Sequence, residues 1–278
     1  MAAAARRGRD RPGGHAGIPA GGQDGVRLRR RCAGKGGSVG HDGAGRECAV
    51  HGDEPERSTP GQGRRGTVSA AELFDGLGLD YERAFGRLPA QLAAVEWLSA
   101  RLDPGARVLD VGSGTGRPVA ERLVRAGCEV TGIDVSGVMV GLARAQVPGA
   151  RFEQCDVRGF SAPEGSFDAV CAFFPLLMMS REEACAALER MAGWLAPGGY
   201  LVSATVPADV EGVEIEWMGR RVEVSAFPAE EYLRRLREDC GLEVLHHAVS
   251  LFEPEGELAA PEEHLFCYAR RRPAAAPR

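Results

Sequence analysis

From residue 107 onward, short apolar runs alternate with segments in which apolar residues recur three or four positions apart. The apolar runs, expected to be strands, lie at 107–111, 129–134, 151–155, 167–173 and 200–206. The segments with helical periodicity lie between them, at 118–126, 137–145 and 180–195. Strands that alternate with helices of this length indicate βαβ units. The pattern therefore predicts an α/β fold around a mostly parallel sheet with helices on both faces.

Before this region the pattern is helical. Ser69 and Glu72 have the spacing of a capping box, which predicts a short helix ending at Leu77. Residues 81–102 also carry helical periodicity, but Pro89 interrupts it and predicts a kink or break. Two or more helices are therefore expected ahead of the first strand.

After the fifth strand the pattern changes. Residues 213–226 alternate between apolar and polar around Met218-Gly219, as a β-hairpin does. A helix is expected at 229–240, followed by two long strand-like runs at 242–252 and 264–271. The hairpin is thus predicted to be an insertion after the fifth strand.

The first 66 residues have the composition of a segment that does not fold alone. They hold 17 glycines and only six residues from Ile, Leu, Val, Phe, Met, Trp and Tyr, and their net charge is +6. Lys35 is the only lysine of the whole chain, as GC-rich coding sequence would give. We expect residues 1–66 to be either a disordered Arg/Gly-rich extension or a misassigned start of translation. Residues 67–272 are expected to form one domain, and 273–278 a disordered tail.

Charge and cysteine pattern narrow the class of protein. Residues 67–278 have a net charge of −11, which argues against a nucleic-acid partner. The eight cysteines form no Cys-x-x-Cys pair and no metal-ligand spacing, so no metal is expected. No apolar run is long enough to cross a bilayer. These features predict a cytoplasmic protein without a membrane partner, either a monomer or a homodimer.

The stretch 108–118, VLDVGSGTGRP, carries the first candidate chemistry. Gly112, Gly114 and Gly116 follow the apolar run at a spacing of two, where their lack of Cβ lets a ligand approach the backbone. The dinucleotide fingerprint G-x-G-x-x-G needs its third glycine where Arg117 stands. The loop therefore indicates a nucleotide-like ligand other than NAD.

Three carboxylates stand at equivalent places in successive strands. Asp110 lies beside the glycines, Asp134 ends the second strand, and Asp156 follows the third. Ligands of such folds bind at the carboxyl ends of the strands. A carboxylate at the end of the second strand can accept hydrogen bonds from both ribose hydroxyls. Another carboxylate, one strand further, can accept a hydrogen bond from the amine of adenine. One such acid alone is more often a helix cap or a solvated loop residue, whereas three together favour an adenosine ligand.

With these motifs the chain resembles the class I S-adenosylmethionine-dependent methyltransferases. The resemblance rests on VLDVGSGTG, on GIDVS with Asp134 18 residues after Gly116, on the acid after the third strand, on FDAVCAFF, and on LAPGG before YLVSATV. It covers roughly Tyr81 to Arg271. It implies a Rossmann-like, doubly wound, seven-stranded sheet whose last strand runs antiparallel, with an N-terminal helical lid.

The resemblance also implies positions for S-adenosyl-L-methionine. The glycines would flank the methionine part, Asp134 the ribose, and Asp156 with the Val157 amide the adenine. The implied cofactor residues are Asp110, Gly112, Gly114, Gly116, Asp134, Val135, Asp156, Val157 and Phe173.

In family members that act on small molecules, the acceptor pocket is built from the lid, the segment after the fourth strand and the insertion after the fifth. Packing in the core would use the same apolar residue types, so both interpretations stay open for each residue. The acceptor residues implied here are Tyr81, Phe85, Phe174, Met178, Met179 and Trp217.

The chemistry asks mainly for alignment of a nucleophile, and for a general base only if that nucleophile must lose a proton. His246, His247 and His264 are the candidates by residue type, with His246 and His247 favoured. Adjacent residues of a strand face opposite ways, so only one of those two can point inward. A histidine on the outer surface of the sheet is the competing interpretation.

The sequence therefore predicts an enzyme that transfers a methyl group to an O, N or C nucleophile of a small, fairly apolar molecule, as in secondary metabolism. Two alternatives remain. One is a protein that binds the cofactor without methylating, such as a cyclase on the same scaffold. The other is an RNA methyltransferase that uses the basic N-terminal segment. An NAD-dependent oxidoreductase is disfavoured by Arg117.

Overall fold

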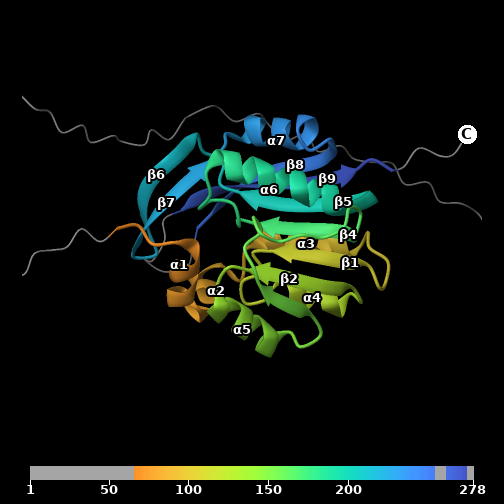
Figure 1. Cartoon of the computed structure of the whole chain (residues 1–278), viewed down its shortest axis with the longest axis horizontal. Coiled ribbons are helices and arrows are strands. Elements are labelled where there is room, and N and C mark those ends of the chain that lie inside the picture. Colours follow the sequence, from red (N-terminus) through yellow and green to blue (C-terminus); the bar gives the residue numbers. More distant parts are fainter. Residues whose placement is uncertain (1–65, 254–260, 274–278) are drawn as a thin grey trace, which may run out of the picture. The chain divides into compact units, whose positions relative to one another are not determined.

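The computed structural model describes residues 66–253 and 261–273 (Figure 1). The expectations for residues 1–65 and for 274–278 lie outside the described residues. Across the described ranges, the helices are too short or too polar to cross a bilayer.

The main sheet has seven strands and is doubly wound, as expected. Its strands are β1 (Arg107–Val111), β2 (Glu129–Asp134), β3 (Arg151–Gln154), β4 (Phe167–Phe173), β5 (Leu195–Thr205), β8 (Leu242–Phe252) and β9 (Glu262–Arg271). Their order is β3-β2-β1-β4-β5-β9-β8. Strand β9 is antiparallel to β5 and β8, and the other neighbours pair in parallel. Because β1 lies between β2 and β4, the strand order reverses there, and the carboxyl ends at that point are where such folds bind ligands.

Helices cover both faces of this sheet (Figure 1). Along β1, Val108 packs into one buried cluster and Leu109 into the other, because successive side chains of a strand point to opposite faces. The cluster that contains Leu109 is covered by α6 (Arg181–Trp194) and α7 (Ala229–Glu238). The cluster that contains Val108, called here the α3 face, is covered by α3 (Pro89–Ser99), α4 (Val119–Arg125) and α5 (Gly137–Gln146).

The lid region consists of α1 (Ala70–Leu77) and α2 (Leu79–Phe85), ahead of α3. The predicted capping box is present: the Ser69 side chain accepts from the Glu72 amide, and Glu72 accepts from the Ser69 amide at 2.9 Å. The predicted break at Pro89 is also present, and Pro89 is the first residue of α3. Proline suits this position because a helix makes no internal hydrogen bond from its first N–H.

The hairpin consists of β6 (Val210–Trp217) and β7 (Arg220–Ala226), which pair antiparallel. Met218 and Gly219 both have positive φ, 47° and 71°, as the tight turns of two-residue hairpins require. The Val68 amide donates to the Arg221 carbonyl at 3.0 Å, so the hairpin contacts the chain just ahead of α1.

The largest difference from the expected strand boundaries is at β5. Strand β5 begins at Leu195 instead of at 200, so the Pro-Gly-Gly segment lies inside the strand and not in a turn before it. Leu195 pairs with Phe167 and Tyr200 with Ala169, so the register between β4 and β5 shifts here and the extra residues lie in β5. A Cβ on Gly199 would lie 2.9 Å from the Asp168 carbonyl oxygen, which is why glycine stands there.

Candidate functional site

The glycine loop leaves the carboxyl end of β1 and is tied to β2. The amides of Gly112 and Ser113 both donate to the Ile133 carbonyl, at 2.8 and 3.0 Å. The Gly114 amide donates to a carboxylate oxygen of Asp134 at 2.8 Å. These bonds fix the loop against the end of the second strand.

The glycines of this loop serve two different purposes. Gly112 has φ 69°, and a Cβ there would lie 2.7 Å from the Cβ of Pro175, so this glycine permits close packing of the loop after β4. Gly114 has φ 50°, and a Cβ there would meet nothing within 4 Å. Gly114 is therefore the loop position that borders open space, into which a ligand can approach the backbone.

Asp134 is buried at the end of β2 with both carboxylate oxygens engaged. One oxygen accepts from the Gly114 amide at 2.8 Å and the other from the Ser136 amide at 2.9 Å. Burial raises the pKa of Asp134, although these two amide bonds oppose the rise. Each oxygen keeps a second lone pair, so the carboxylate can still accept from a ligand hydroxyl.

Asp110 lies on the same face of the sheet, on the neighbouring strand. It is 2 % exposed, and its Oδ2 has no hydrogen-bond partner among the described residues. Burial, together with the negative charge of Asp134, raises the pKa of Asp110 to about 7. A buried carboxyl without a partner is costly unless a ligand supplies one, so this atom marks a place for a polar or cationic group.

Asp156 follows β3 as predicted, but the structure gives its carboxylate another partner. Arg158 binds both oxygens, with Nη2 to Oδ2 at 2.6 Å, and also reaches Glu183 at 2.6 Å. The hydrogen bonds from Arg158 lower the pKa of Asp156. Asp156 is thus an ion-paired loop residue, neither a helix cap nor a solvated side chain, and a contact from its carboxylate to adenine would have to displace Arg158.

The remaining implied cofactor residues lie around the same edge. Val135 follows β2, and its carbonyl accepts from the Gln154 side chain at 3.2 Å. Val157 is buried, and its carbonyl accepts from Arg190. Phe173 is buried at the end of β4, 6.2 Å from the Phe266 ring. These placements agree with the motif positions without testing the roles.

The lid, the hairpin turn and the strand ends meet in an apolar group that we call the lid cluster. Its rings pack on one another: Phe85 lies 5.5 Å from Trp217 and 5.2 Å from Tyr81. Four of the implied acceptor residues, Tyr81, Phe85, Phe174 and Trp217, are thus brought together, whereas Met178 and Met179 lie outside this group. The members of the lid cluster are Leu77, Tyr81, Ala84, Phe85, Leu88, Phe174, Trp217, Met218 and Phe252.

Phe174 has an unusual backbone. Its φ is 64°, in the left-handed region that a bulky aromatic residue rarely occupies. The amide of Phe174 donates to the Ala204 carbonyl at 2.9 Å, which holds the strained residue at the end of β4. Such strain is concentrated at functional sites, and the Phe174 ring packs against the lid cluster.

Asp75 of α1 is a site residue that the sequence did not reveal. One of its oxygens accepts from the Ser136 hydroxyl at 2.5 Å and from the Val138 amide at 3.1 Å. These hydrogen bonds lower the pKa of Asp75. Asp75 therefore fastens the lid to the start of α5, next to Asp134. No motif surrounds it, and only the folded chain brings it there.

The two favoured histidines lie on the edge strand β8, in the exposed position that was the competing interpretation. His246 and His247 are both exposed on β8, the edge strand of the sheet, with β9, β5 and β4 between β8 and β1. His264, in contrast, is buried at the start of β9. Within the described part of the chain, no three His, Cys, Asp or Glu side chains gather as a metal site requires.

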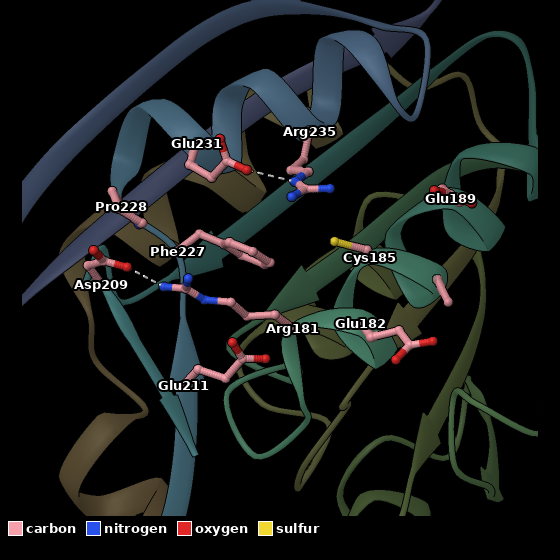
Figure 2. Close-up of a pocket in the computed structure, with 11 residues that line it drawn as sticks. Arg181, Glu182, Cys185, Glu189, Asp209, Glu211, Phe227, Pro228, Glu231 and Arg235 are labelled. Atoms are coloured by element: carbon pink, nitrogen blue, oxygen red, sulfur yellow. Dashed lines mark hydrogen bonds and ion pairs between the residues drawn. The ribbon is translucent and has the colours of Figure 1, made fainter. Parts of the chain in front are cut away.

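A hollow of about 710 Å³ lies away from the glycine loop, between α6, α7 and the chain around β6 and β7 (Figure 2). Arg181 and Asp209 form an ion pair across it at 2.6 Å, and Arg235 pairs with Glu231 at 2.9 Å. These charges neutralise one another in pairs. The residues implied for cofactor and acceptor do not line the hollow.

Comparisons with known proteins agree with the geometry. Residues 108–199 match the family model of a methyltransferase domain. A ubiquinone biosynthesis O-methyltransferase of Xanthomonas axonopodis is 38% identical over 119 residues, which are 40% of this chain and 48% of that protein. The chain spans about half the length of the curated relatives it matches.

Solved structures show the same fold. The 1,6-didemethyltoxoflavin-N1-methyltransferase of Burkholderia thailandensis, with its substrate and S-adenosylhomocysteine bound, is 22% identical with a TM-score of 0.57, over 73% of this chain and 87% of that one. The cyclase SpnF is 21% identical with a TM-score of 0.56, and the match covers 76% of this chain and 100% of SpnF. Residues 108–199 thus match a methyltransferase domain, and the fold around them is the one that solved S-adenosylmethionine-dependent methyltransferases share.

Proposed function

We propose that the protein transfers the methyl group of S-adenosylmethionine to a small, fairly apolar molecule. The observation that carries this proposal is a buried carboxyl without a hydrogen-bond partner among the described residues, Asp110, in the strand that leads into the glycine loop. The same loop borders open space at Gly114. A cationic amino acid moiety would lie over the glycine loop, where Asp110 can accept from its ammonium group. The family match over 108–199 supports the same ligand.

Each end of this ligand has a candidate partner on the chain. Asp134 keeps free lone pairs for ribose hydroxyls while the Gly114 and Ser136 amides hold it in place. Two neighbouring acids, Asp110 and Asp134, also favour a ligand that is positively charged. Asp156 contributes through its loop with Arg158, so the contact from its carboxylate to adenine stays a prediction.

When bound, the cofactor supplies a methyl group made electrophilic by its sulfonium. The task of the chain is then to align a nucleophile, and such alignment can lower the activation barrier by roughly 7–11 kcal/mol. The lid cluster supplies an apolar surface for the acceptor and keeps water from it. Because its rings are in contact, the acceptor must enter while α1 and α2 are displaced from the hairpin turn.

The acceptor class is supported by the lid cluster and by the relatives. Aromatic rings from four segments line one region, as small-molecule pockets require. The similar proteins are named for action on small molecules: ubiquinone precursors, an amino sugar nucleotide and a toxoflavin precursor. We extend this to the present chain as a small apolar acceptor.

The cellular setting follows from the thiols. Six cysteines of the described part are free, and Cys171 and Cys267 are buried in the sheet. Free thiols of this kind suit a reducing compartment, so we propose the cytoplasm.

The test is transfer of labelled methyl from S-adenosylmethionine to a panel of small phenols, amines and activated carbon acids, using the full chain. Label in an organic product supports the proposal. Binding of S-adenosylhomocysteine with no transfer to any member of the panel would contradict it and favour a non-methylating protein or a cyclase.

A further inference from the structure

His264 is the buried histidine at the carboxyl edge of the sheet. Phe266 and Tyr268 point to the α3 face, so His264, two residues before Phe266 on the same strand, points there too. This is the face on which Asp110 and Asp134 lie, by the same alternation from Val108 and Val130. His264 precedes Leu265, which pairs with Thr205, the last residue of β5.

The ring of His264 is held between two rings of the lid cluster. Its centroid lies 4.5 Å from that of Phe174 and 5.4 Å from that of Phe252, with which it is stacked at 20°. His264 is only 1 % exposed. It therefore belongs to the floor of the region proposed for the acceptor, beside the strained Phe174.

Glu262 fixes the orientation of this ring. The two residues are two apart on β9 and so share a face, and Nε2 of His264 lies 2.9 Å from Oε1 of Glu262. A carboxylate can only accept, so Nε2 carries the hydrogen and Nδ1 keeps its lone pair. A histidine oriented by a carboxylate in this way is the arrangement of a general base.

Tyr81 is another titratable group of the lid cluster. Burial, and then the charges of Asp134 and Glu262, raise the pKa of Tyr81. Tyr81 therefore remains a neutral phenol. It packs on Phe85 in the same lid cluster as Phe174 and Phe252, the two rings next to His264.

We propose that His264, oriented by Glu262, is the general base of the reaction and that the acceptor is an aromatic hydroxyl compound. The inference rests on the proposed methyltransferase function and narrows its acceptor to an oxygen nucleophile. A base is needed because a hydroxyl must lose its proton, and an aromatic acceptor suits the rings of Phe174, Phe252 and Tyr81.

The step is balanced without a further reactant. The acceptor O–H bond breaks and its proton passes to Nδ1 of His264. The oxygen forms a bond to the methyl carbon with a lone pair, and the pair of the broken S–C bond stays on sulfur. The products are the methyl ether and S-adenosylhomocysteine, and His264 returns its proton to water.

The kinetic test compares His264→Asn with His246→Asn in the full chain. His246 is a matched control because it is exposed on the edge strand. The acceptors are 4-nitrophenol, 4-methylphenol and 2-naphthol. The first is largely ionised at pH 8, whereas the hydroxyls of the other two have a pKa near that of tyrosine, ~10. In His264→Asn we expect the rate with the two weak acids to fall about 10²–10⁴-fold, the usual contribution of a base, and the rate with 4-nitrophenol to fall much less.

Equal loss on all three phenols in His264→Asn would overturn the base role, because a structural defect does not depend on the acidity of the acceptor. Methylation of none of the phenols by a wild-type protein that binds S-adenosylhomocysteine would overturn the acceptor class. Absence of S-adenosylhomocysteine binding would instead remove the proposed function itself.

A second readout needs no acceptor. Long-range ¹H–¹⁵N spectra of the histidine rings report which nitrogen carries the proton, and His264→Asn assigns the signal. We expect the Nε2–H form in the wild type and a mixture of forms in Glu262→Ala, with S-adenosylhomocysteine affinity changed less than about threefold in both variants. A wild-type His264 with its hydrogen on Nδ1 would overturn the proposal.

Discussion

At the residue scale, the site depends on two aspartates in different surroundings. Asp134 receives two backbone amides, whereas Asp110 has an oxygen with no partner in the described part of the chain. Amide donors stabilise a carboxylate and burial destabilises it, so the two acids respond differently to substitution and to pH.

Asp134→Ala removes the acceptor proposed for the ribose and leaves the Gly114 and Ser136 amides without their partner. Loss of partners for buried polar groups costs about 1–3 kcal/mol, so we expect S-adenosylhomocysteine to bind roughly 5- to 150-fold more weakly. Calorimetry measures this. The control is Asp168→Ala, at the opposite end of β4 and paired with Arg107, and equal affinities of the two variants would refute the assignment.

Asp110 makes stability depend on pH. Its pKa is raised to about 7 by burial and by Asp134, so the folded protein favours the protonated form. This contribution is complete below the unfolded pKa of about 4 and is lost as pH rises through 7. Between pH 5 and 8 the free energy of unfolding should fall by about 2–3 kcal/mol more in the wild type than in Asp110→Asn. Denaturant unfolding at both pH values tests this, and parallel curves would contradict it.

The sequence revealed those residues that stand in a motif. Asp110, Asp134 and the glycines follow strands at fixed spacing, so a linear pattern locates them. Asp75 and the pair of Glu262 and His264 reach the site from distant segments, and only tertiary structure brings them together. His246 and His264 are alike by residue type, and burial alone separates them.

At the element scale, the glycine loop should tolerate no side chain at Gly114. An alanine there would adopt φ 50° and project into the space proposed for the cofactor. We expect Gly114→Ala to weaken S-adenosylhomocysteine binding at least tenfold, by calorimetry. Gly141→Ala on α5 is the matched control: its Cβ also meets nothing within 4 Å, but its backbone is helical, so affinity should be unchanged. Retained binding in Gly114→Ala would mean that the ligand lies elsewhere.

The contact of the lid with α5 should control cofactor release. Asp75→Ala removes two hydrogen bonds between α1 and the start of α5, each worth about 0.5–1.5 kcal/mol. We expect S-adenosylhomocysteine to dissociate roughly tenfold faster, measured by stopped-flow fluorescence. Asp80→Ala removes an equal charge from α2, where Asp80 pairs with Arg83 at the surface, and should leave the rate alone. An unchanged rate in Asp75→Ala would show that the lid does not cover the cofactor.

Element boundaries were predictable where a local signal ends the element. Ser69 and Ser180 begin helices with capping boxes, and Pro89 starts α3. The start of β5 was not predictable, because pairing of Leu195 with Phe167 depends on a partner strand and overrides a turn-like Pro-Gly-Gly segment. Contacts across the sheet therefore set those strand boundaries for which the local sequence carries no signal.

At the scale of the whole molecule, the periodicity of the chain predicted the layers. Apolar runs on alternate faces of β1 and its neighbours require helices on both sides, and the α3, α4 and α5 layer opposes the α6 and α7 layer as expected (Figure 1). The closed contact of lid and hairpin was only implied by resemblance, because no local pattern places Trp217 against Phe85. This contact would cover the region proposed for the acceptor.

Calorimetric titration of the full chain with S-adenosylhomocysteine, with NADH as the control ligand, tests the cofactor site most directly. We expect micromolar binding of S-adenosylhomocysteine and none of NADH, because Arg117 stands where a dinucleotide loop needs glycine. Binding of NADH, or of neither ligand by a folded protein, would contradict the assignment of the glycine loop as the S-adenosylmethionine site.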